Sequence, residues 1–163
     1  MPPRSGVRTW PFTTFIMLLV VLHLLLHVGL GIGTLAPDFM AVAVLIAARR
    51  STATGAVALA VLLGIVDDAM GIRNLGMRSI ALGSAALLLT WSRNFIEGEG
   101  LLFVLAYLFL GKWVIEIVLG ILASVTTPDP LALVTWAPLA SAWTAVAGTF
   151  ALMAFRSVAG PDA

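Results

Sequence analysis

Long apolar stretches, separated by a few short charged segments, most constrain what this chain can fold into. Four stretches, about 10–33, 74–92, 101–124 and 136–156, hold the roughly 20 residues that a transmembrane helix needs. The 163 residues are 61% hydrophobic and 10% charged, whereas a soluble domain is typically about 25% charged. We therefore expect one integral membrane domain, over 1–163, that is all-α.

The composition also excludes several classes of function. The net charge of +1 argues against nucleic acid as a partner, and the absence of cysteine excludes disulfides and thiol chemistry. The sequence contains no pattern of nucleophile and base, no phosphate-binding glycine loop and no two-metal carboxylate cluster. We expect a protein that is not an enzyme and that needs no cofactor or metal.

Two further segments are less regular. The stretch 51–70 reaches full length only by including Asp67 and Asp68 in its last turn. The stretch 37–48 is about 18 Å long as a helix, against a hydrocarbon core of about 30 Å. Arg49 and Arg50 would have to reach the interface, and the glycine-containing connection over 29–34 would have to fold into the bundle, because irregular backbone at that depth must be covered.

The distribution of positive charge decides whether 37–50 crosses the membrane. With six crossings and a cytoplasmic N-terminus, six arginines lie inside and at most two outside; with five crossings the split is four to four. The positive-inside rule therefore favours six spans, about 10–33, 37–50, 51–70, 74–92, 101–124 and 136–156. The first span lacks a cleavage site, so we expect it to be retained, with both termini cytoplasmic.

The segment 64–78 carries two acids and two arginines in apolar surroundings. Charged side chains in or near hydrocarbon are usually paired or functional. The topology places Asp67 and Asp68 at the end of the third span and Arg78 one turn into the fourth, at the same depth on the outer side. We expect a salt bridge between these spans and assign it to Asp68 and Arg78. The alternative is an interfacial turn whose charges are hydrated independently.

Several residues follow one another in the order of a known family. They are Pro37-Asp38, Arg49-Arg50, Gly64, Asp68, Gly71 and Leu75-Gly76. This order resembles the MreD family of bacterial rod-shape-determining membrane proteins, over about 37–122. The chain departs from the family pattern in the second acid, Asp67, in Arg73-Asn74, and in Arg78, where histidine is common.

The resemblance implies a non-enzymatic scaffold of the cell-elongation machinery in the bacterial inner membrane. Its partners would be an MreC-like bitopic protein and membrane lipids, and indirectly the MreB filament and the peptidoglycan synthase pair. The implied fold is that of the substrate-binding components of energy-coupling vitamin transporters. A small-solute-binding subunit of such a transporter is the alternative, although the first span carries bulky residues and two histidines instead of those components' alanine stripe.

Polar residues inside the other spans leave alternatives open. Asp38 is expected to cap a helix that begins after Pro37, and an added cavity or partner role stays open. Lys112 and Glu116, four residues apart, can pair with each other, or they can contact a partner or line a polar pocket. His23 and His27 share a helix face, and we expect them to contact another helix rather than a metal.

Small residues at four-residue spacing mark two spans where helices can approach closely. Packing inside the bundle and docking of a partner helix both fit this pattern. The two stripes are Ala56, Ala60 and Gly64, and Ala140, Thr144 and Gly148.

Overall fold

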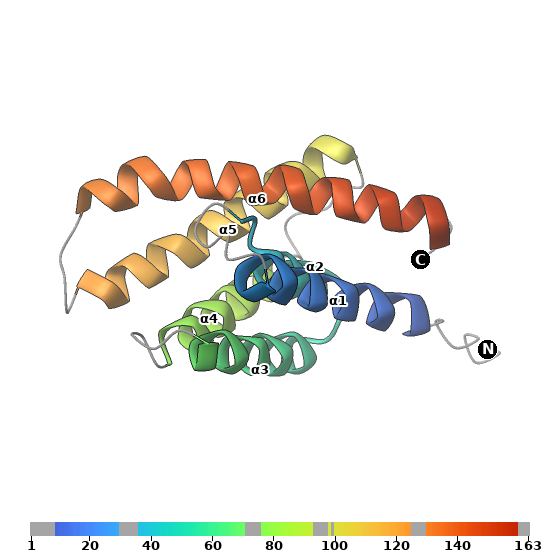
Figure 1. The fold of residues 1–163 in the computed structure, drawn as a ribbon, viewed down its shortest axis with the longest axis horizontal. Helices are drawn as coiled ribbons and strands as arrows, with labels where there is room; N and C mark the ends of the chain where they lie inside the picture. Colours follow the sequence, from blue (N-terminus) through green and yellow to red (C-terminus); the bar gives the residue numbers. More distant parts are fainter. Residues whose placement is uncertain are drawn as a thin grey trace.

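The computed structural model describes residues 9–29, 36–70, 76–92, 98, 100–124 and 130–159, and these residues form an all-helical membrane bundle (Figure 1). The expected fold class is confirmed. The elements are α1 (Thr9–Leu24), which continues as the π-helical turn η1 (Leu25–Gly29), α2 (Phe39–Arg50), α3 (Ala53–Met70), α4 (Met77–Ser92), α5 (Leu101–Ser124) and α6 (Pro130–Ala159).

Three of these helices are long and apolar enough to cross a membrane. They are α3, α5 and the 135–158 part of α6. The helix α6 begins before and ends after the expected span 136–156. Crossing by α1, α2 and α4 stays a prediction. Gly71 and residues 30–34 of the expected inward connection lie outside the described residues.

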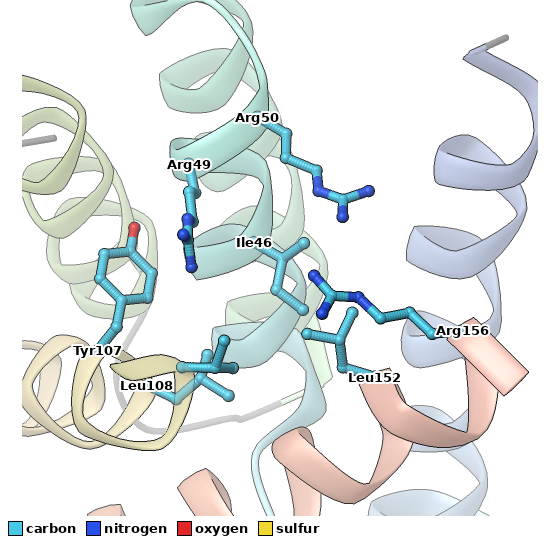
Figure 2. Close-up of a pocket in the computed structure, with 8 residues that line it drawn as sticks. Ile46, Arg49, Arg50, Tyr107, Leu108, Leu152 and Arg156 are labelled. Atoms are coloured by element: carbon cyan, nitrogen blue, oxygen red, sulfur yellow. The ribbon is translucent and has the colours of Figure 1, made fainter. Parts of the chain in front are cut away.

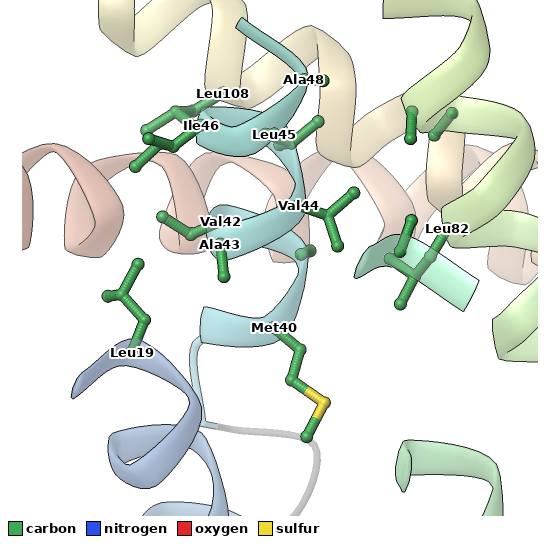
Figure 3. Packing of buried hydrophobic residues seen from close by; sticks show 14 of the residues in the cluster. Leu19, Met40, Val42, Ala43, Val44, Leu45, Ile46, Ala48, Leu82 and Leu108 are labelled. Atoms are coloured by element: carbon green, nitrogen blue, oxygen red, sulfur yellow. The ribbon is translucent and has the colours of Figure 1, made fainter. Parts of the chain in front are cut away.

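The short helix α2 forms the core of the bundle. Its residues from Phe39 to Ala48 are all buried, and it contacts α1, α3, α4, α5 and α6. Figure 3 shows side chains leaving α2 in several directions, toward Leu19, Leu82 and Leu108 of three other helices. A helix that is apolar on every side is stable only when it is surrounded, so its composition explains its central place.

Glycines allow α5 and α6 to lie close to α2. A Cβ on Gly148 would come within 2.8 Å of a Val42 methyl group, and one on Gly111 within 2.5 Å of a Leu45 methyl group. Thr144, one turn before Gly148, is also buried. The Thr144 and Gly148 part of the α6 stripe therefore packs inside the bundle.

The stripe on α3 packs internally as well. Ala56 and Ala60 are completely buried, and a Cβ on Gly64 would overlap the backbone of Ser79 on α4. Gly76, just before α4, has a φ of +89° and open space around its Cα. The two glycines thus have different roles. Gly64 permits a close helix crossing, and Gly76 permits a left-handed turn.

We expect Gly64→Ala to lower the free energy of unfolding by about 2 kcal/mol, because the added methyl group meets backbone that cannot move aside. The measurement is unfolding by sodium dodecyl sulfate in mixed micelles. The matched control is Gly83→Ala in α4, whose Cβ would meet only a Val61 methyl group at 3.3 Å. Equal losses in the two variants would contradict the assigned backbone contact.

Candidate functional site

One polar cluster, here called the Asp38 cluster, receives side chains from five helices and from the N-cap residue of α2. Its members lie on α1, α3, α4, α5 and α6, and at the start of α2. They are His23, Asp38, Asp67, Asp68, Arg78, Lys112, Glu116 and Thr144.

Asp38 is at the centre of this cluster. Its Oδ1 accepts the N–H of Ala41 at 3.0 Å, so the expected capping of α2 is confirmed. Its Oδ2 accepts hydrogen bonds from Lys112 Nζ at 2.6 Å and from Arg78 Nη1 at 3.0 Å. Its own N–H donates to Thr144 Oγ1 at 3.2 Å. The capping residue of the central helix therefore also links α4, α5 and α6.

Arg78 joins two acids from different helices. Besides Asp38, it pairs through Nε with Asp67 Oδ2 at 2.8 Å. A salt bridge between α3 and α4 therefore exists, but its acid is Asp67, and the assignment to Asp68 is wrong. Adjacent helical residues point about 100° apart, so only one of the two acids can face the guanidinium.

Asp68 instead caps α4 from the neighbouring helix. Its carboxylate accepts the N–H groups of Arg78 and Ser79, each at 3.0 Å, and the Ser79 hydroxyl at 2.7 Å. The first N–H groups of a helix have no partner within the helix, and a carboxylate there is also favoured by the helix dipole. The sequence predicted that Asp68 lies next to Arg78, but it did not predict that the partners of Asp68 are backbone N–H groups.

Lys112 and Glu116 form the expected pair, with 2.5 Å between Nζ and Oε1. Lys112 is 2% exposed and also binds Asp38, whereas the Glu116 side chain is 25% exposed. The pair is therefore one edge of the larger cluster. This connection to α2 was not predicted.

His23 is completely buried between two carboxylates. Its Nδ1 lies 3.7 Å from Asp38 Oδ1 and its Nε2 lies 3.5 Å from Asp67 Oδ1, and neither nitrogen makes a hydrogen bond. The His27 ring stacks on it with 4.0 Å between ring centroids. The expected contact with other helices is confirmed for His23, whereas His27 contacts His23 of its own helix. Within the described ranges, no set of three or more candidate side chains is placed to hold a metal ion.

The cluster neutralises much of its own charge. Each of its four carboxylates accepts from, or pairs with, a cation or an N–H group: Asp38, Asp67, Asp68 and Glu116. Such groups are stable away from water only when paired and hydrogen-bonded. The arrangement is suited to holding helices together.

The other predicted site residues lie apart from the cluster or beside it. Pro37 directly precedes Asp38, and its carbonyl accepts the N–H of Phe39 at 3.1 Å. Arg49 and Arg50 lie at the opposite end of α2, where Arg49 donates to the carbonyl of Gly98 and lies 4.8 Å from the centroid of the Phe103 ring. Arg156 of α6 lines the same pocket as these two arginines. The spacing of these arginines along the chain did not predict this convergence.

Neither a protein-family model, nor a curated protein, nor a solved structure matches this chain. The fold and the cluster define a six-helix membrane bundle with an internal ionic network.

We expect Lys112→Met to lower the free energy of unfolding by about 3 kcal/mol, because it leaves a buried carboxylate with one cation fewer. Adding Asp38→Asn should recover part of this loss, since Asn keeps the helix cap without the charge. A double-mutant cycle of detergent unfolding measures the coupling. Strictly additive losses would show that the two side chains do not interact.

Arg78→Gln should lower the free energy of unfolding by about 2 kcal/mol, somewhat less than for a fully buried pair, because its side chain is 27% exposed. Thermal unfolding in detergent checks this. The matched control is Arg50→Gln at the exposed end of α2, which removes the same group from a position without a carboxylate partner among the described residues. A loss of stability as large in the control as in Arg78→Gln would contradict the bridging role.

Proposed function

We propose that this chain is a non-enzymatic scaffold subunit of the bacterial cell-elongation and peptidoglycan-synthesis machinery. In this proposal it binds an MreC-like bitopic protein within the inner membrane, and through it connects to the MreB filament and the peptidoglycan synthase pair. The proposal rests on the resemblance of the segment 37–122 to the MreD family.

One observation links these residues to a scaffold: four of the motif residues, Asp38, Gly64, Asp68 and Gly76, serve the contacts and the turn that join α2, α3 and α4. Asp38 holds Arg78, Asp68 caps α4, and Gly64 allows α3 and α4 to touch. Gly76 makes the turn into α4. The spacing of these four residues is thus explained by the need to lock α2, α3 and α4 together, as a rigid scaffold requires.

The gathering of arginines supports the proposed orientation. Arg49, Arg50 and Arg156 line one pocket at one end of the bundle. In Figure 1, the start of α1 and the end of α6 lie on the same side. By the positive-inside rule this end faces the cytoplasm, with both termini.

Depletion and co-purification test the proposal. In its own host, depletion of the chain should convert elongated cells into round cells. The tagged full chain should co-purify with the co-expressed MreC-like protein through size-exclusion chromatography. Normal cell shape after depletion would contradict the proposal, and co-purification with ATPase subunits would favour a transporter.

Glu116→Gln should restore cell shape in depleted cells as fully as the unchanged chain does. Gln keeps a hydrogen-bond acceptor near Lys112 and removes the most exposed acid among those paired in the cluster with Lys or Arg side chains. Loss of a positioned acid or base would cost an enzyme on the order of 10²–10⁴-fold in rate. Failure of Glu116→Gln to complement, at normal protein level, would contradict a scaffold role.

A further inference from the structure

Three arginines from two helices converge on one cavity of about 300 Å³ (Figure 2). Arg49 and Arg50 end α2, and Arg156 lies near the end of α6. The remaining lining residues are apolar or aromatic: Ile46, Val104, Tyr107, Leu108 and Leu152. This cavity, here called the arginine pocket, lies at the end of α2 opposite to Asp38.

Among the residues that the structure describes, no acidic side chain balances the positive charge of the arginine pocket. No carboxylate among the described residues pairs with Arg49, Arg50 or Arg156. Arg156 Nε is buried and makes no hydrogen bond. Arg49 and Arg156 both repel Arg50 electrostatically.

A helix dipole does not account for this arrangement. Cations at a helix C-terminus are favourable, which explains why arginines end α2. It does not explain why Arg156 of another helix points into the same cavity or why its Nε is buried without an acceptor. An anion between the guanidinium groups would relieve the repulsion and supply the missing acceptor.

The surroundings indicate which anion fits. A guanidinium group can bind two oxygens of one phosphate at the same time. A second recess of about 220 Å³ adjoins the pocket, shares Val104, Leu152 and Arg156 with it, and adds Leu101, Thr149 and Met153. A phosphate beside an apolar recess at the end of membrane helices is the chemistry of a phospholipid, and basic pockets between transmembrane helices bind anionic headgroups.

We propose that the arginine pocket binds the phosphate of an anionic phospholipid of the phosphatidylglycerol type, with an acyl chain in the adjoining recess. A headgroup that carries an ammonium group would be repelled by the three guanidiniums. The site shares no residue with the Asp38 cluster, and lipid binding can be tested without the proposed scaffold partners.

The test uses the purified full chain in nanodiscs of phosphatidylcholine, with or without phosphatidylglycerol. Phosphatidylglycerol should raise the Tm by a few degrees. Arg50→Gln and Arg156→Gln should abolish this rise and weaken the retention of phosphatidylglycerol in native mass spectrometry roughly tenfold or more. In pure phosphatidylcholine both variants should be as stable as the unchanged chain or more stable, because they reduce repulsion.

A second pair of variants tests the acyl-chain recess. Met153→Trp should fill the recess and weaken phosphatidylglycerol retention. Met17→Trp should not, because Met17 is an exposed residue of α1 that lines neither cavity.

A further experiment distinguishes a lipid headgroup from free phosphate as the bound anion. The Tm in phosphatidylcholine nanodiscs is measured with inorganic phosphate and with chloride at equal ionic strength. An equal rise in Tm with inorganic phosphate alone, or unchanged lipid retention in the arginine variants, overturns the proposal.

Discussion

A carboxylate inside a membrane bundle is stable only if cations and N–H groups replace the water that it has lost. Asp38 meets this requirement with Lys112, Arg78 and the N–H group of Ala41, which all bind its carboxylate, and its own N–H donates to Thr144. Each of these partners comes from a different helix. The positions of α2, α4, α5 and α6 therefore depend on one another through a single residue.

The length of α2 explains why this residue is internal. A helix of 12 residues spans about 18 Å, so if its arginine end lies near one membrane surface, its capped end stops within the bilayer. Lys112, near the middle of α5, lies at the depth where that end stops. The two ends of α2 thus differ in charge. At one end Asp38 is paired with cations, and at the other end three arginines lie together.

The sequence predicted the helical membrane class, the shortness of the second helix and the pairing of Lys112 with Glu116, because these depend on local composition and spacing. It also placed an acid and Arg78 together between two helices, but it chose Asp68 where Asp67 is the partner. The contacts of His23 with two acids depend on the rotation of helices, which spacing along the chain does not specify. The contact of Asp38 with Lys112 depends on helix rotation in the same way.

The enclosure of α2 has a consequence for biosynthesis. The helix is contacted by all five others, and Gly148 on the last of them lies directly against Val42. At 12 residues it is too short to be held by lipid alone, which requires about 20. The second helix to leave the ribosome therefore reaches its final environment only after the sixth has been synthesised. In a nascent chain that stops before α6, α2 would lack one of the helices that cover it. Correct folding of α2 therefore requires that α6 has been synthesised.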